Sequence, residues 1–400
     1  MHKTVGIICE YDPFHVGHAR HYDLIREKQP NAAIVCIMSG PFTQRGMPAL
    51  FAPAMRARAA LNAGADMVME LPTLFATREA EHFCLSGVSI LHKLNFISYI
   101  SFGCENNNLQ LLSEAATLLE QPGEDFLTHR TKGLRQGLSF AAAQGSALAH
   151  SLSRSTYSHG MAEMAGILAA PNNILAIGYL RAIQRLGSPI KPLPVQRIGA
   201  YHAKEIEYYP SATAIRAALM AGERDKAEAA CGYTFPTEPY CRPDALDAVL
   251  LSRLRQMSKE ELSLLPDCSE GLENSLFRFC RKAVGREQLL EMLKSKRYTH
   301  ARLSRLLTHA LLGITAGMQA SAPFPNYARL LGFRKGSEPL LRFLQKSHLP
   351  VIAKAINGPT DDPVYQLDAR AYDLWALGAN QPAGLMFNQP IEIVPDETGQ

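Results

Sequence analysis

Short apolar runs that favour β-strands alternate with amphipathic helical segments through the first half of the chain, and this alternation restricts the fold more than any other feature. Five runs are predicted as strands, at residues 4–9, 32–38, 66–71, 96–102 and 191–198, and prolines mark the last as an edge strand. Helices are predicted at residues 17–28, 53–62, 77–94 and 172–186. Because strand–helix–strand units join parallel strands by right-handed crossovers, we expect an α/β protein with a doubly wound parallel sheet.

Two other regions are predicted to be mainly helical. Residues from about 109 to 170 show no strand pattern and are interpreted as a helical insertion. Prolines at 236, 239 and 243 mark a boundary, and helices are predicted beyond it at 245–256, 259–264, 273–284, 288–296 and 299–312. After Pro350 we predict few periodic segments. The expected organisation is an α/β domain at residues 1–225 and a mostly helical domain at residues 240–400.

Composition excludes several classes of protein. Of the 400 residues, 47% are hydrophobic and 20% are charged, which is typical of a globular chain. No apolar run approaches the length of a membrane span, and residues 4–9 are too short for a signal peptide, so we expect a cytoplasmic protein without a membrane segment. The eight cysteines include no C-x-x-C pair, so we expect reduced thiols and no metal site. A net charge of +4 permits an anionic partner.

The strongest motif lies where the first predicted strand meets the first helix, and reads Glu10-Tyr11-Asp12-Pro13-Phe14-His15-Val16-Gly17-His18. In an open parallel sheet this is the carboxyl edge, where ligands bind. His15 and His18 are three residues apart and share one face of the first helical turn. Two imidazoles beside a helix N-terminus can stabilise negative charge on an α-phosphate under attack, so both are candidate catalytic residues. The alternative is a pair of ordinary surface histidines.

The motif resembles the H-x-G-H signature of the nucleotidylyltransferase superfamily, which also contains the class I tRNA synthetases. The resemblance implies attack on the α-phosphate of ATP with release of pyrophosphate. It also implies a Ser/Thr-rich element before a late helix, and Ser211-Ala212-Thr213-Ala214-Ile215-Arg216 is similar to that element. Ser211, Thr213 and Arg216 would then meet the triphosphate. The alternative is a capped helix with no ligand.

Further stretches resemble one bacterial family in particular, the tRNA(Met) cytidine acetate ligases. They run in order from residue 6 to about residue 300. Beyond the first motif they include Met38-Ser39-Gly40-Pro41-Phe42-Thr43-Gln44-Arg45-Gly46, Gly64-Ala65-Asp66-Met67-Val68-Met69-Glu70-Leu71-Pro72, Phe102-Gly103-Cys104-Glu105, Pro171-Asn172-Asn173-Ile174-Leu175 and Lys296-Arg297-Tyr298-Thr299. The resemblance implies an ATP-dependent ligase that forms acetyl-adenylate and acetylates N4 of the wobble cytidine of elongator tRNA(Met). It implies a nucleotidylyltransferase-like catalytic domain and a helical C-terminal part that helps to hold tRNA.

The resemblance also implies an ATP site, with Mg²⁺ only as the usual companion of the phosphates. Its residues would be Ile7, Ile8, Cys9, Glu10, Tyr11, Asp12, Pro13, Phe14, His15, Val16, Gly17, His18, Ala19, Arg20, Gly103, Asn172, Asn173, Arg197, Ile198, Ser211, Thr213 and Arg216. Plainer interpretations remain for some of them, because Gly103 suits a turn and Asn172 suits a helix cap. The chain departs from the family pattern at Asp12 and Pro41, where asparagines are typical, and at residues 52–54 and 140–143.

Two basic features remain. Gln44, Arg45 and Gly46 follow the second strand at the ligand edge, where Arg45 could neutralise phosphate or simply be solvated. Residues 278–305 carry nine lysines and arginines against Glu287 and Glu291. The candidate tRNA contacts there are Lys294, Lys296, Arg297, Tyr298, Arg302 and Arg305. The alternative is a solvated helix face with an apolar side packed on the core.

Two rival functions stay open at this point. One is a nucleotidylyltransferase that joins AMP to a small phosphorylated substrate, which needs no basic helical half. The other is a non-catalytic RNA-binding protein that keeps the fold but not the turnover.

Overall fold

The computed structural model describes residues 3–138, 140–153, 164–166, 168, 170–196, 211–235, 240–295 and 297–396. Three of the predicted site residues, Arg197, Ile198 and Lys296, lie outside these ranges. In the described part of the chain, no helix combines the length and apolar character that a bilayer span needs. All eight cysteines are free thiols.

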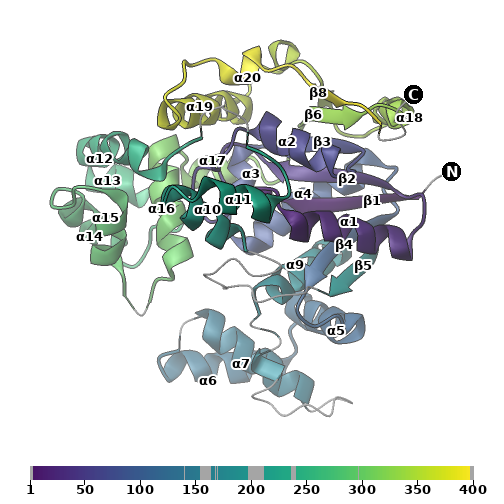
Figure 1. Cartoon of the computed structure of the whole chain (residues 1–400). Coiled ribbons are helices and arrows are strands. Elements are labelled where there is room, and N and C mark those ends of the chain that lie inside the picture. Colours follow the sequence, from purple (N-terminus) through teal and green to yellow (C-terminus); the bar gives the residue numbers. More distant parts are fainter. Residues whose placement is uncertain are drawn as a thin grey trace.

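Five parallel strands, on the right in Figure 1, form most of the sheet, and they confirm the predicted fold class. They are β1 (Thr4–Cys9), β2 (Ala33–Ser39), β3 (Met67–Leu71), β4 (Tyr99–Cys104) and β5 (Lys191–Gln196). Their order in the sheet is β5-β4-β1-β2-β3, so the chain reverses its winding direction between β1 and β4. In such a sheet the reversal opens a crevice at the carboxyl ends of the strands.

Helices cover both faces of this sheet because side chains alternate along each strand. On one face Val5 and Ile7 of β1 pack with Ile25 of α1 (Val16–Lys28) and Ala60 of α2 (Pro53–Asn62). On the other face Ile8 belongs to the core that includes α4 (Ala80–Leu94) and α9 (Pro171–Arg185). Close packing of these apolar side chains on both faces makes the sheet a rigid platform for the residues at its edge.

The sheet contains three more strands than the five that were predicted. Strand β6 (Ala328–Arg334) pairs antiparallel with β3, and β7 (Val351–Ile352) and β8 (Glu392–Val394) pair with β6. The prediction of few periodic segments after Pro350 is wrong for α19 (Pro363–Gly378), a helix of 16 residues capped by Asp362. Its buried positions include Leu367, Ala371 and Trp375, at helical spacing. The predicted boundary between residues 225 and 240 stays a prediction.

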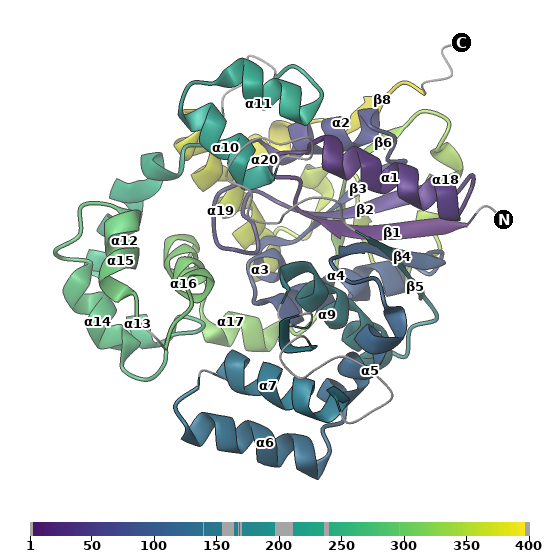
Figure 2. The same cartoon turned by 60° about the horizontal axis from the view of Figure 1, so that its bottom comes forward.

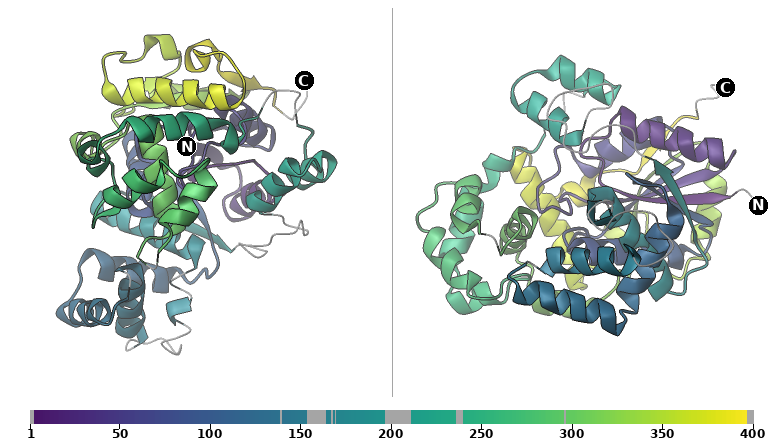
Figure 3. Two further views of the ribbon diagram at one scale, coloured as in Figure 1. Left: turned by 90° about the vertical axis from the view of Figure 1, so that its left-hand side faces the viewer. Right: turned by 90° about the horizontal axis from the view of Figure 1, so that it is seen from below.

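The predicted insertion is helical where it is described. Helix α5 (Leu109–Glu120) packs on α9, and α6 (Glu124–Arg135) and α7 (Phe140–Ser153) form a hairpin that projects from the bottom of the molecule in Figure 1. The remaining helices are α3 (Thr73–Ala76), α10 (Ala212–Met220), α11 (Arg224–Cys231), η1 (Pro243–Leu246), α12 (Asp247–Gln256), α13 (Lys259–Ser263), α14 (Leu272–Phe279), α15 (Arg286–Leu293), α16 (His300–Leu312), α17 (Ala316–Ser321), α18 (Glu338–Leu344), η2 (Ala355–Asn357) and α20 (Leu385–Asn388). Helices α12–α15 form a group beside the sheet, and α16 stands between that group and the sheet (Figures 2 and 3).

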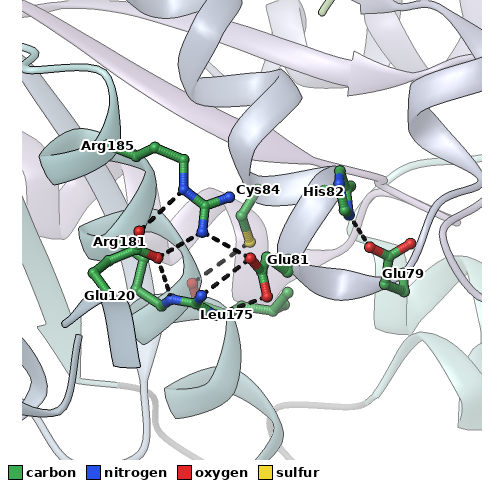
Figure 4. A network of polar contacts seen from close by, with 8 residues as sticks. All are labelled: Glu79, Glu81, His82, Cys84, Glu120, Leu175, Arg181 and Arg185. Atoms are coloured by element: carbon green, nitrogen blue, oxygen red, sulfur yellow. Dashed lines mark hydrogen bonds and ion pairs between the residues drawn. The ribbon is translucent and has the colours of Figure 1, made fainter. Parts of the chain in front are cut away.

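Two arginines of α9 tie that helix to its neighbours (Figure 4). Arg181 lies 2.8 Å from Glu81 of α4 and 2.7 Å from Glu120 of α5, and Arg185 contacts the same two carboxylates at 2.9 and 2.7 Å. Because these groups are partly exposed, each pair contributes about 1 kcal/mol or less to stability. Their main effect is to fix α9, whose N-terminus reaches the carboxyl edge of β4.

A buried polar network attaches the C-terminal segment to the sheet. Arg329 of β6 donates from Nε to Glu70 of β3 at 2.6 Å and from Nη2 to the hydroxyl of Tyr372 at 2.5 Å. Asp368 accepts the backbone N–H of Thr73 at 2.7 Å. All of these groups are buried, so each relies on the others for its hydrogen bonds and for compensation of its charge.

Candidate active site

The two motif histidines lie together at the start of α1. His15 is the N-cap, and its Nδ1 accepts the backbone N–H of Gly17 at 3.1 Å. Nδ1 of His18 accepts the backbone N–H of His15 at 3.2 Å, and the two rings stack with centroids 3.8 Å apart. Since both Nδ1 atoms accept, the neutral rings carry their hydrogen on Nε2. With their hydrogens on Nε2, the two rings can donate to a phosphate at a helix N-terminus.

Aromatic residues of the same motif pack against His18. The rings of Tyr11 and Phe14 contact the ring of His18, with centroids 4.8 and 5.4 Å away. Tyr22 of α1 donates its hydroxyl to that of Tyr11 at 2.7 Å. Several side chains of the predicted ATP site are thus buried: Ile7, Ile8, Cys9, Tyr11 and Phe14. Because their side chains are buried, these residues can contact a nucleotide only through their backbone N–H and C=O groups. Their side chains support the backbone of the site.

Arg56 of α2 holds together the loops that follow β1 and β2. It is 1% exposed and donates to the backbone carbonyls of Phe51 at 3.0 Å, Glu10 at 2.5 Å and Gly40. Burial lowers the pKa of Arg56, although nearby carboxylates oppose this. Arg56 was not among the predicted site residues. Its role at the junction of two strand ends is visible only in three dimensions.

The two sequence pieces that the superfamily resemblance links are in contact. Ser211 caps α10 by accepting the N–H of Ala214 at 3.1 Å. Nη1 of Arg216 donates to the carbonyl of Asp12 and lies 3.3 Å from its carboxylate. Nη2 donates to Oγ1 of Thr213 at 3.2 Å. Arg216 thus arrives beside the H-x-G-H motif, and the departure from asparagine at Asp12 gives this arginine an anionic partner.

Asn172 and Asn173 hold the loop that follows β4. The carboxylate of Glu105 accepts Nδ2 of Asn172 at 2.6 Å and the backbone N–H of Asn173 at 3.0 Å. Oδ1 of Asn173 accepts the N–H groups of Glu105 and Asn106, and the residue is fully buried. Gly103 pairs with Val195 in the β4–β5 ladder just before this loop. Glu105 was not among the predicted site residues, and the contacts of Gly103 and both asparagines with a nucleotide stay a prediction.

Helices α15 and α16 hold the loop that follows β2. The carbonyl of Gly46 accepts hydrogen bonds from Arg286 at 2.5 Å, Thr308 at 2.6 Å and Ser304 at 3.2 Å. Gly46 has a φ of +72°, and a Cβ at this position would meet the α16 backbone, so only glycine fits. Earlier in this loop the backbone N–H of Gln44 donates to the Glu10 carboxylate, whose pKa is raised by burial. The C-terminal helices therefore shape the ligand edge of the sheet.

The basic segment at residues 278–305 divides into exposed and buried parts. Lys294 and Arg297 are exposed, and Arg302 is half-buried with its guanidinium 4.9 Å from the centre of the Tyr298 ring. Arg305 is 8% exposed, and Arg286 is buried too. The segment is therefore not one continuous solvated stripe, because some of its charges point into the junction between α16 and the sheet.

Acid should weaken the packing of α16 through His309. The imidazole is 1% exposed, and its Nε2 lies 2.9 Å from the Thr77 carbonyl. Burial lowers the pKa of His309 from 6.5 to about 4, so unfolding takes up a proton between these values and stability falls as the pH drops through that window. The free energy of unfolding, measured in urea, should fall by roughly 3 kcal/mol from this group between pH 7 and pH 4. An equally steep loss in His309→Gln would show that other groups cause it.

Comparisons with known proteins agree with this architecture. The sequence model of the HIGH Nucleotidyl Transferase family matches residues 2–389. A protein named tRNA(Met) cytidine acetate ligase from Clostridium perfringens (strain SM101 / Type A) is 34% identical over 383 residues, which cover 94% of this chain and 95% of that protein. A protein of the same name from Clostridium acetobutylicum is 35% identical over 395 residues, 94% of each chain.

Solved structures give the same result at lower sequence identity. The crystal structure of Thermotoga maritima TmcAL bound with alpha-thio ATP has a TM-score of 0.87 at 25% identity and covers 98% of this chain and 100% of that chain. The apo crystal form of the same protein has a TM-score of 0.89 at 26% identity, with the same coverage.

A parallel sheet with H-x-G-H at its first strand–helix junction defines the class of HIGH-type nucleotidyl transferases. Within that class, the chain belongs to the family of the tRNA(Met) cytidine acetate ligases. The predicted family, fold class and enzyme class, a ligase, are thereby confirmed.

Proposed function

We propose that this chain activates acetate with ATP and then acetylates N4 of the wobble cytidine of elongator tRNA(Met). The observation that carries the proposal is the stacked His15–His18 pair, which offers Nε2–H donors beside Arg216 at the ligand edge of the sheet. Support comes from the relatives that bear this activity in their names and from the ATP analogue bound by the related structure. The cytoplasmic location expected from the sequence stays a prediction.

The first step is adenylation. An acetate oxygen forms a bond to the α-phosphorus of ATP, and the bond from that phosphorus to the bridging oxygen breaks, so that pyrophosphate leaves. Negative charge grows on the α-phosphate oxygens as the attack proceeds, and the Nε2–H groups of His15 and His18 would stabilise it. Arg216, whose side chain is 36% exposed, is accessible from one side and would neutralise phosphate charge.

The second step is acyl transfer. N4 of the cytidine attacks the acetyl carbonyl, the bond from that carbon to the phosphate oxygen breaks, AMP leaves, and the amine loses a proton. Mg²⁺ would enter only with the ATP phosphates. The motif carboxylates do not suit it, because Glu10 already accepts the N–H of Gln44 and Asp12 accepts that of Leu50.

Acetate-dependent exchange of labelled pyrophosphate into ATP, without tRNA, tests the first step directly. Exchange that requires acetate is the expected result. If neither acetate alone nor acetate with total tRNA supports exchange, the proposal fails. A transferase that joins AMP to a small phosphorylated substrate would instead show exchange with that substrate and no affinity for tRNA.

The exposed side chains of Lys294 and Arg297 should contribute to tRNA affinity. In the double variant Lys294→Gln/Arg297→Gln, we expect weaker tRNA binding and a salt dependence of log K that is flatter by about 0.7–0.9 for each phosphate that is no longer neutralised. Both side chains are exposed, so folding should be unaffected. Filter binding at several salt concentrations measures both quantities. Wild-type affinity at low salt would remove these residues from the RNA interface.

A further inference from the structure

Three arginines from distant parts of the chain gather where α16 meets the end of α3. Arg78 follows α3, whereas Arg302 and Arg305 belong to α16. His309, one turn after Arg305, lies 2.9 Å from the carbonyl of Thr77 and fixes α16 against the residue that precedes Arg78. Asp267 links the three arginines. Its charge acts on Arg78, its carboxylate lies 3.4 Å from Nη2 of Arg305, and its carbonyl accepts Nη2 of Arg302 at 2.8 Å.

Arg78 is buried without a matching anion. It is 8% exposed, and its Nε and Nη1 donate no hydrogen bond within the described part of the chain. The negative charges that act on its guanidinium are those of Glu79 and Asp267. Glu79 pairs with His82 (Figure 4), although its charge also acts on Arg78. Burying a guanidinium without a partner is costly, so the surroundings of Arg78 are suited to a group that the described chain does not supply.

Asp267 does not balance the other two arginines. Its carboxylate lies 3.4 Å from Nη2 of Arg305, and its carbonyl accepts Nε and Nη2 of Arg302 at 3.1 and 2.8 Å. Nε of Arg305 also has no hydrogen-bond partner among the described residues. The side chain of Asp267 is 30% exposed, so this cluster opens to solvent at that point. The surplus of positive charge calls for an anion.

The position of the cluster indicates which anion. On the inner side, Gln44 bridges the cluster to the active site: its Nε2 donates to the carbonyl of Arg78 at 3.0 Å, and its backbone N–H donates to Glu10. On the outer side, Arg302 covers the ring of Tyr298, next to the exposed Arg297. Positive charge therefore extends from the surface to the edge of the active site. Such a track suits a polyanion more than a single nucleotide.

We propose that Arg78, together with Arg302 and Arg305, binds a phosphodiester group of the RNA substrate close to the nucleotide that receives the acyl group. The guanidinium fork matches the two free oxygens of a phosphodiester. The inference rests on the proposed function, because it assumes that RNA is the acyl acceptor. It differs from the contacts of the exposed Lys294 and Arg297, since Arg78 and Arg305 are buried and Arg78 adjoins the loop whose Gln44 contacts Glu10.

Arg78→Met in the full-length chain is the test. We expect tRNA affinity to fall by about tenfold and the salt dependence of log K to flatten by about 0.7–0.9. Acetate-dependent pyrophosphate exchange without tRNA should stay within about twofold of wild type, because the variant leaves adenylation untouched. The melting temperature without RNA should not fall, since the substitution removes an uncompensated buried charge.

Two further variants serve as controls. Arg342→Met removes the same charge from exposed α18, at the opposite end of the molecule from α16 (Figure 1), and should leave tRNA affinity unchanged. Arg78→Lys keeps the positive charge and should keep the wild-type salt dependence while losing part of the affinity, because lysine lacks the fork. If the methionine variant fails to fold, the tRNA affinity of Arg78→Lys still tests the inference.

Three outcomes would overturn the inference. Wild-type affinity and salt dependence in Arg78→Met would show that no phosphate binds there. Loss of exchange as large as the loss of tRNA binding would assign the arginine to the phosphates of ATP. An equal loss of tRNA affinity in Arg342→Met would show that the effect comes from the net charge of the protein and not from a site at Arg78. Failure of the proposed function is seen separately, as absence of acetate-dependent exchange in the wild type.

Discussion

Replacing His18 by alanine should slow acetate-dependent exchange of pyrophosphate into ATP by about 100- to 1,000-fold, the range found when one preorganised donor to developing phosphate or carbonyl charge is removed. The structure provides the reason. Nδ1 of His18 is occupied by the backbone N–H of His15, so the hydrogen sits on Nε2 and needs no rearrangement to meet the substrate. The free energy of unfolding should fall by only about 1 kcal/mol, because the variant removes one capping hydrogen bond.

His92 offers a matched control for this variant. It lies in the last turn of α4, where its Nδ1 contacts Oγ of Ser188 at 3.1 Å, at the end of the helix remote from the carboxyl edge of the strands. His92→Ala should therefore keep the wild-type rate of exchange. His18→Asn, which retains a side-chain donor and acceptor, should recover part of the rate. Wild-type exchange in a folded His18→Ala protein would remove the histidine from the chemistry.

The central strands and the first motif could be predicted from sequence because their signals are local. Strand β1 is an uninterrupted apolar run, and the motif His15-Val16-Gly17-His18 begins a few positions after its end. The meeting of Arg216 with Asp12 is not local, since 204 positions separate them. The resemblance predicted only that Arg216 would meet the triphosphate beside the first motif, and its contact with Asp12 became visible in the structure.

Other parts of the site left no readable signal in the sequence. Gly46 belongs to a loop, and nothing in its neighbourhood indicates that Arg286, Ser304 and Thr308 would converge on its carbonyl. Strand β6 is similar: its residues become a strand by pairing antiparallel with β3, a partner far earlier in the chain. Helix α19 is a different case. Its apolar residues recur at helical spacing in the sequence, but the many prolines and glycines around it led to the prediction of few periodic segments.

The buried pair Glu70–Arg329 should show the largest effect on stability. Arg329→Met leaves the carboxylate of Glu70, 1% exposed, without its partner at 2.6 Å, and removes the donor to Tyr372. Because an uncompensated buried charge remains, the free energy of unfolding should fall by about 3–5 kcal/mol, measured by urea unfolding at neutral pH.

The double variant Glu70→Gln/Arg329→Met removes both charges and should recover much of that loss, since the cost arises from the unpaired carboxylate and not from the absent arginine. Arg58–Glu392 gives a surface counterpart that also connects an N-terminal helix to a C-terminal strand, at 2.8 Å with Arg58 45% exposed. Arg58→Met should cost less than about 1 kcal/mol. If Arg329→Met cost no more than this, the C-terminal strands would be held to the sheet by apolar packing alone, and the polar network would have only a directional role.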